Sequence, residues 1–259
     1  MTDFIVVNGT PVDIRVALQW QALAGNMELS DRTVANAAVV QHARKNNLAA
    51  APEEIQKFFD EMRHKMNFES AEATRAWMTQ HNYDLATVQN FCEIGVLRNK
   101  IRASIGDGDV AAYFAENKQK YDIADLYSLT VAKEELANEL KAQIEDGAAT
   151  FQALAMEHSI DNDTYRQGGF MGETTRNKLS GAVEAAVFAA KPNEVLGPFK
   201  HADGYSLYMV RRIVSPQLEG IKELIRDEMF EQRLEDIADH AEVRHVLLGF
   251  NAAPGGMGG

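Results

Sequence analysis

The sequence predicts an α+β protein in which a small domain of helices and strands is inserted into a mainly helical module. Three observations carry this prediction. Apolar residues recur with helical spacing over residues 10–105 and again over 218–240. Between these segments, the pattern changes to strand-like alternation mixed with short helices. The helix at 218–240 has an apolar face that needs a partner, so we expect it to pack on the N-terminal helices.

The N-terminal segment begins with a predicted strand and continues as helices. Residues 4–7 are apolar and end at Asn8-Gly9, which is a turn dipeptide. Thr10 can cap a following helix, and Pro11 after it suits the first helical position. Serine and aspartate cap helix N-termini and proline suits the first turn, so further helices are expected to start at Ser30, Pro52, Ser70 and Asp84.

The middle segment follows a short helix expected at 110–118. Its alternating stretches predict strands at 125–131, 195–199 and 205–213. Its helical stretches are expected at 134–144, 150–158 and 181–190. Residues 161–172 are polar and contain glycines, which predicts a loop. The order strand, two helices, loop, helix and two strands is typical of a small α+β domain.

These patterns give four regions with definite boundaries. Residues 1–121 form the N-terminal helical module and 122–214 form the inserted domain. Residues 215–248 carry the helix that packs back on the module. Residues 249–259 are rich in glycine, which predicts a disordered tail. The apolar helix faces leave an alternative open, in which they form a homodimer or an exposed groove for unfolded chain.

Composition excludes several classes of function. The chain has 26 Lys and Arg against 38 Asp and Glu, a net charge of −12, which argues against nucleic-acid binding. The single Cys92 excludes an internal disulfide framework and a multi-cysteine metal site. No apolar run approaches the length of a membrane span, and no secretory signal is visible. We therefore expect a cytoplasmic protein without a membrane partner.

Five short motifs in the middle segment resemble, in order and spacing, those of the parvulin-type peptidyl-prolyl isomerases (PpiC-type rotamases). They are the helix at 151–159, the turn at 167–172, the helix at 185–189, and the strands at 197–199 and 204–207. The flanks are similar to SurA-like and PrsA-like foldases, through Val7-Asn8-Gly9 before a helix and the run Val110–Lys118. In those proteins both chain ends build a helical chaperone module around a parvulin domain.

The resemblance implies a site for a proline-containing peptide. The family's two histidines fall at Ser128 and Ser206, so both are replaced by serine here, and its Cys/Asp position falls at Asp161. The positions implied to contact the substrate are Met171, Leu179, Val183, Phe188 and His201. Without the resemblance, the apolar residues of this set would be interpreted as ordinary core, and Asp161 as a solvated loop acid.

Two functions therefore stay open for the chain. The first is an isomerase or foldase that acts on Xaa-Pro bonds of a peptide or unfolded protein. The second is a catalytically weak or inactive parvulin-like chaperone that binds a specific client, which the loss of both histidines favours. Twisting an amide requires no covalent step, so we expect neither cofactor nor metal.

Overall fold

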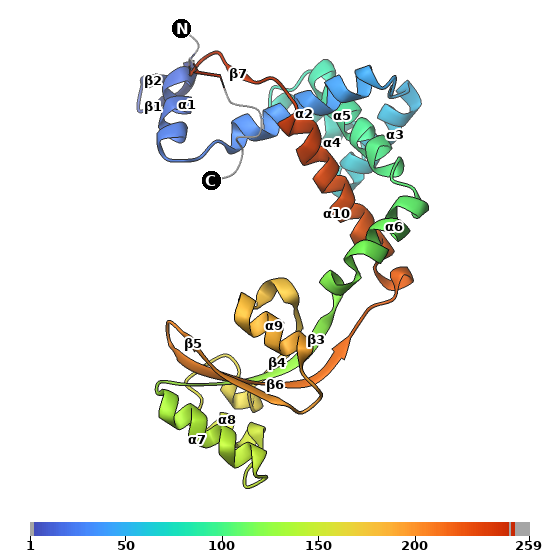
Figure 1. The fold of residues 1–259 in the computed structure, drawn as a ribbon. Coiled ribbons are helices and arrows are strands. Elements are labelled where there is room, and N and C mark those ends of the chain that lie inside the picture. The colour runs from blue at the N-terminus through green and yellow to red at the C-terminus, as the bar shows by residue number, and fades with distance from the viewer. Residues whose placement is uncertain (1–2, 249, 252–259) are drawn as a thin grey trace. The chain divides into compact units, whose positions relative to one another are not determined.

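The computed structural model describes residues 3–248 and 250–251, and its chain divides into two compact units (Figure 1). Unit 1 joins residues 1–110 to residues 223–259, and unit 2 is the continuous segment 111–222. The first and last segments of the chain thus belong to the same unit. Unit 2 extends beyond the predicted 122–214 at both ends, because it also includes the second half of helix α6 (Asp107–Asn117) and the start of helix α10 (Leu218–Asp239).

The chain begins with a hairpin of β1 (Asp3–Val7) and β2 (Thr10–Asp13). The predicted helix start at Thr10 is therefore wrong. Asn8 and Gly9 both have positive φ, 50° and 82°, which is the geometry of a two-residue hairpin turn. Helix α1 (Ile14–Leu23) follows, and the Asp13 carboxylate caps it by accepting the Arg15 N–H at 2.8 Å.

Four helices complete the N-terminal part of unit 1. They are α2 (Glu28–Lys45), α3 (Pro52–Lys65), α4 (Ala71–Gln80) and α5 (Leu85–Ala103). The predicted caps are confirmed, since Ser70 accepts the Ala73 N–H at 3.1 Å and Asp84 accepts the Thr87 N–H at 2.7 Å. Helix α2 begins at Glu28 rather than at the predicted Ser30.

Helix α10 lies against the N-terminal helices. Arg102 of α5 donates to Asp227 at 2.6 Å and to Glu223 at 2.8 Å. Arg226 donates to the carbonyl of Ile105, which follows α5. These polar contacts lie beside a buried stripe on α10 that consists of Ile225, Phe230, Leu234 and Ala238.

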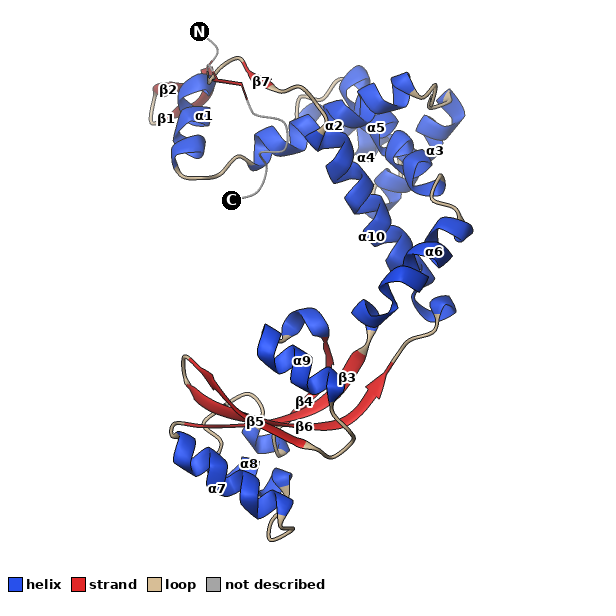
Figure 2. Cartoon of the chain, in the orientation of Figure 1, coloured by secondary structure: helices blue, strands red, loops and turns tan. Residues whose placement is uncertain are grey.

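Unit 2 is built on an antiparallel sheet of four strands in the order β4-β3-β6-β5 (Figure 2). Its strands are β3 (Ile123–Val131), β4 (Phe170–Thr175), β5 (Val195–His201) and β6 (Gly204–Val214). Helices α7 (Glu134–Glu145) and α8 (Phe151–His158) cover one face, and α9 (Gly181–Ala189) covers the other. Strand β4 lies partly in the stretch predicted as a loop, so that prediction is wrong for residues 170–172.

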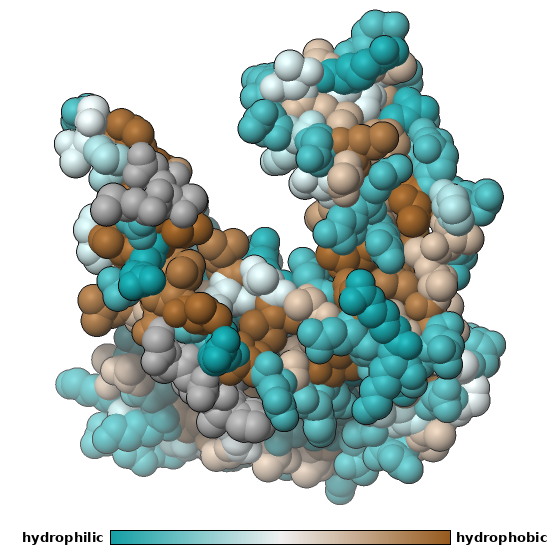
Figure 3. Space-filling view, turned by 90° about the horizontal axis from the view of Figure 1, so that it is seen from above, coloured by the Kyte–Doolittle hydropathy of each residue, from teal (hydrophilic) through white to brown (hydrophobic). Residues whose placement is uncertain are grey.

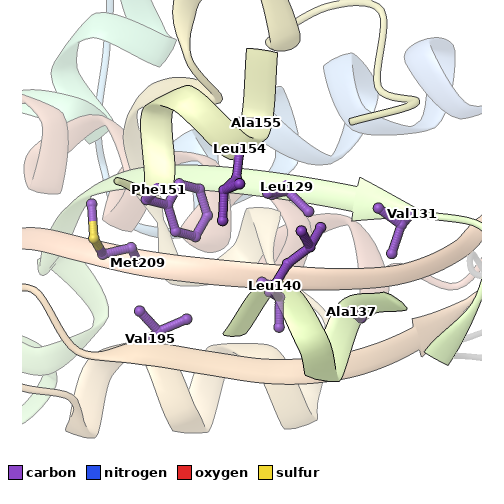
Figure 4. Close-up of a cluster of buried hydrophobic side chains, with 10 residues drawn as sticks. Leu129, Val131, Ala137, Leu140, Phe151, Leu154, Ala155, Val195 and Met209 are labelled. Carbon is purple, nitrogen blue, oxygen red and sulfur yellow. The ribbon is translucent and has the colours of Figure 1, made fainter. Parts of the chain in front are cut away.

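Each face of this sheet has its own apolar core. On the α7 and α8 face, buried side chains from β3, β5, β6 and both helices meet, among them Leu129, Leu140, Phe151, Leu154 and Met209 (Figure 4). On the α9 face, a second cluster contains Ala124, Leu126, Val183, Val187 and Val210. The strand alternation thus separates two cores, one on each face of the sheet.

The remaining features concern the surface and the C-terminus. Brown areas in Figure 3 show hydrophobic side chains at the surface, and in unit 1 exposed ones include Phe4, Val6, Trp20, Leu23 and Phe91. Strand β7 (Arg244–His245) pairs with β8 (Phe250–Asn251). The rest of the predicted disordered tail, residues 249 and 252–259, lies outside the described residues. No described helix combines the length and apolarity that a membrane crossing requires.

Candidate active site

Four polar side chains line the sheet face that carries α9. Ser128 and Thr130 are two residues apart on β3, and Ser206 and Tyr208 are two residues apart on β6, so each pair shares a face. The strand register places Thr130 opposite Ser206 and Ser128 opposite Tyr208. Ser128, Thr130 and Ser206 are buried. Buried hydroxyls need hydrogen-bond partners, and these define the site.

Ser206 stands between two partners. Its Oγ lies 2.8 Å from Oγ1 of Thr130 and 2.6 Å from Nε2 of His201, the last residue of β5. The two serines at the family's histidine positions thus bond to different partners, because Ser128 Oγ lies 3.5 Å from Oγ1 of Thr164. An imidazole reaches Ser206 although position 206 itself no longer holds one.

Asp161 lies in the loop after α8. Its Oδ1 accepts the Asp163 N–H at 3.0 Å, and its Oδ2 accepts the Thr164 hydroxyl at 2.7 Å. Because Thr164 also contacts Ser128, the carboxylate is linked to the buried face of β3 through one hydroxyl. Asp161 is therefore held in place by its neighbours rather than simply solvated.

The loop that carries Asp161 is fastened to β3 by Ser159. The Ser159 Oγ accepts the Thr130 N–H at 3.2 Å and the Asp161 N–H at 3.3 Å. The Ile160 N–H donates to the Thr130 carbonyl at 2.8 Å. Thr130 is therefore the residue at which the two halves of the polar network meet. Through Thr130, Thr164 and Ser159, hydrogen bonds connect Ser128, Asp161 and Ser206.

Tyr208 completes the polar part of the site. Burial raises the pKa of its phenol above the ordinary value of 10.0, and the Asp161 carboxylate acts in the same direction, while a hydrogen bond with Ser206 acts against them. A phenol has a reduced tendency to ionise in this setting, because a phenolate would be poorly solvated and would lie near a carboxylate. At neutral pH the ring is thus a neutral hydrogen-bonding group.

The apolar part of the site comes from the segment around α9. Leu179, Val183 and Phe188 pack in the same cluster as Phe199 and Tyr208. Val183 is only 6% exposed and belongs to the buried part of this cluster. The Arg176 guanidinium lies 4.0 Å from the centre of the Phe188 ring, which gives that ring a protein partner on one face.

Met171 takes a different place. It lies at the bulge where the pairing of β4 with β3 shifts register, and its side chain is 38% exposed. It is not among the described members of the α9 cluster. Of the predicted apolar contacts, the structure therefore groups Leu179, Val183 and Phe188 and leaves Met171 nearer the surface.

Sequence reasoning missed three residues of this site. Thr130 and Tyr208 could have been found, because strand alternation places them on the same face as Ser128 and Ser206. Thr164 had no such signal, since its position depends on the turn after Asp161. Among the described residues, no group of three or more His, Cys, Asp or Glu side chains is placed to hold a metal ion.

Comparison with known proteins adds a family to this geometry. Residues 128–212 match the Rotamase family, described as the PPIC-type PPIASE domain. The foldase protein PrsA of Caldanaerobacter subterraneus subsp. tengcongensis is 24% identical over 192 residues, which cover 74% of this chain and 58% of that protein. The periplasmic chaperone PpiD of Haemophilus ducreyi is 25% identical over 237 residues, or 88% of this chain and 35% of its own length.

The fold of the whole chain has a solved counterpart. The crystal structure of the peptidylprolyl isomerase PrsA from Bacillus cereus superposes with a TM-score of 0.54, covering 96% of both chains at 17% identity. That likeness extends over the helical unit as well as the sheet domain. The chain spans little more than half of the PrsA relative from Caldanaerobacter. Residues 128–212 therefore match the PPIC-type rotamase domain, and the chain as a whole shares its fold with a PrsA structure.

Proposed function

We propose that this protein is a peptidyl-prolyl cis-trans isomerase that acts on Xaa-Pro bonds of peptides or unfolded proteins. One observation carries the proposal. Within a PPIC-type domain, an apolar floor formed by Leu179, Val183 and Phe188 lies on the same sheet face as the network of Asp161 and its hydroxyl partners. The isomerase function is favoured over a purely binding role, because the polar network is connected even without the family's two histidines.

Prolyl isomerisation requires only that the protein stabilise the twisted amide. Rotation about the peptide bond has a barrier of roughly 18–20 kcal/mol that arises from amide resonance. In the twisted transition state this resonance is lost, and the carbonyl and nitrogen need a different environment. The apolar floor would receive the proline ring and exclude water, while the hydroxyl and carboxylate groups around Asp161 would surround the rotating carbonyl. No covalent intermediate forms.

Exchange NMR on a short Xaa-Pro peptide tests this proposal. We expect the full chain to accelerate cis-trans exchange above the uncatalysed rate, which corresponds to tens to hundreds of seconds. Replacing Asp161 by Ala is expected to lower kcat/KM roughly tenfold or more, because the carboxylate and its bond to Thr164 are lost together.

Asp163→Ala is the matched control for Asp161→Ala. It removes a carboxylate from the same loop, but only the backbone N–H of Asp163 bonds to Asp161. We expect its exchange rate to equal that of the wild type. Exchange by the wild type at the uncatalysed rate would refute the isomerase proposal, and equal losses in both variants would remove Asp161 from the site.

We further propose that unit 1 holds unfolded polypeptide through an apolar pocket. The pocket has a volume of about 350 Å³ and is lined by residues from α3 to α5: Met62, Met66, Trp77, Tyr83, Thr87, Val88 and Phe91. Methionine and aromatic side chains adapt to varied apolar shapes. The relatives named foldase and chaperone support a client of this kind.

Phe91→Ser tests the pocket. Phe91 is 58% exposed, and Leu85 on the same helix is 59% exposed but lies outside the pocket lining, so Leu85→Ser is the matched control. We expect Phe91→Ser, and not Leu85→Ser, to weaken suppression of aggregation of a carboxymethylated, permanently unfolded polypeptide. In a Trp20→Phe background, emission from Trp77 would report occupancy directly. Equal behaviour of both serine variants would show that the pocket is not the holding site.

One finer expectation, a homodimer, remains a proposal. The homodimer is supported by α1, which has no buried residue and exposes Trp20 and Leu23. Short helices are marginal without a packing partner, and a second copy of the chain could supply one. Location in the cytoplasm has no support from the relatives, one of which is named a periplasmic chaperone.

A further inference from the structure

Both ring nitrogens of His201 have partners within the protein. The Nε2 atom lies 2.6 Å from Oγ of Ser206, and Nδ1 lies 3.3 Å from the backbone nitrogen of Asp203. The residue opposite His201 in the strand register is Gly204, which has no side chain. The imidazole can therefore lie across this position and reach the next residue on the same face of β6, which is Ser206.

These contacts determine where the ring carries its proton. A backbone N–H can only donate, so Nδ1 of His201 must accept from Asp203. A neutral imidazole has one N–H, which is then on Nε2 and donates to Ser206 Oγ. Ser206 Oγ also lies 2.8 Å from Thr130 Oγ1, and either hydroxyl can donate in that bond. Hydrogen bonds thus connect His201 through Ser206 to Thr130.

The hydrogen-bonded series ends at Thr130, the residue that secures the loop carrying Asp161. The backbone of Thr130 donates to Ser159 and accepts from Ile160, and Ser159 also accepts the Asp161 N–H. The ring of His201 is thus connected to the loop that carries Asp161 through Ser206 and Thr130.

We propose that His201 is a positioning residue that supplies, from β5, the imidazole that the resemblance places at position 206 on β6. Position 206 holds serine, and the imidazole that contacts it comes from position 201 on the paired strand. His201 was expected to contact the substrate, but both of its nitrogens are used within the protein. The inference rests on the proposed isomerase function and assigns His201 a role within that site.

Three variants test the positioning role of His201 in the assay of cis-trans exchange. We expect His201→Ala to lower kcat about tenfold with little change in KM, because the polar network loses its orientation while the substrate floor is unchanged. His201→Gln keeps a side-chain donor and is expected to lose less. The transposed variant, His201→Ser with Ser206→His, is expected to recover most of the kcat lost in His201→Ala. A rise in KM with unchanged kcat would overturn the inference in favour of direct substrate contact.

A spectroscopic measurement separates this inference from the proposed function. In the full chain labelled with ¹⁵N, the His201 ring is expected to show a single tautomer with the proton on Nε2, which shifts the two ring nitrogens far apart. This holds even if the wild type fails to catalyse exchange, a result that would refute the isomerase proposal alone. A proton on Nδ1, or two tautomers in rapid exchange, would overturn the hydrogen-bond chain itself.

Discussion

Gly169→Ala is expected to destabilise unit 2 by about 3 kcal/mol or more, because it combines an unfavourable backbone conformation with a collision. Gly169 has φ +82°, and a Cβ there would lie 2.2 Å from the carbonyl oxygen of Ser128 and 3.1 Å from Cβ of Ala155. Its own carbonyl accepts the Ser128 N–H at 2.7 Å. Relief of the collision must therefore move β3 at the residue that contacts Thr164, so activity should fall as well.

Gly147→Ala separates the two causes. Gly147 has a similar φ of +71°, but a Cβ there would meet nothing within 4 Å. We expect a cost of about 1 kcal/mol from the backbone alone. Unfolding can be followed by near-ultraviolet circular dichroism, since every tyrosine except Tyr83 lies in residues 111–222. Equal destabilisation by the two substitutions would contradict the predicted contact between Gly169 and β3.

Ile225→Ala is expected to lower the free energy of unfolding of unit 1 by about 2–5 kcal/mol, the usual range for emptying a buried aliphatic site. Ile225 is fully buried on α10, between the two acids, Glu223 and Asp227, that bind Arg102 of α5. A substitution near the end of the sequence should therefore loosen helices formed by its first hundred residues. Both tryptophans, Trp20 and Trp77, lie in unit 1, so their emission during denaturation follows this unit.

Leu224→Ala is the control for the same helix. Leu224 is 59% exposed, and its truncation is expected to change stability by about 0.5 kcal/mol or less. The denaturation midpoint followed by tryptophan emission should fall for Ile225→Ala and remain unchanged for Leu224→Ala. The midpoint followed by the tyrosine signal of unit 2 should remain unchanged in both variants. An unchanged midpoint of the tryptophan transition in Ile225→Ala would show that the last helix does not stabilise the N-terminal helices.

Helices were the most predictable part of the fold because their signals are local. Ser70 and Asp84 cap helices as predicted, and the predicted apolar stripe of α10 is buried at Ile225, Phe230, Leu234 and Ala238. The wrong predictions concern segments whose structure depends on pairing between strands. The Asn8-Gly9 turn signals a hairpin, but Pro11 also suits a helix start, and the pairing of β2 with β1 decided between them. Strand β4 is an edge strand, and polar residues and a glycine conceal its pairing with β3.

The residues of the site likewise divide into those that the sequence predicts and those that it does not. Ser128, Asp161 and Ser206 could be placed together because motif order fixes their positions in the sheet and the loop. The partners of these residues could not, since they arise from contacts across the sheet. Thr164 reaches Ser128 only through the turn that Asp161 starts, and His201 reaches Ser206 only because the opposite residue is Gly204. The resemblance alone therefore suggests a network without an imidazole, whereas the folded chain has one.

The division of unit 1 between two ends of the sequence has a consequence for synthesis on the ribosome. Residues 111–222 are continuous, so the rotamase domain has all its strands as soon as β6 emerges. The N-terminal helices emerge earlier, yet they lack Ile225 and Phe230 until α10 follows. Because a chain folds domain by domain as it is made, we expect the rotamase domain to complete its fold first. The apolar faces that await α10 would meanwhile remain open to chaperones or to the nascent chain itself.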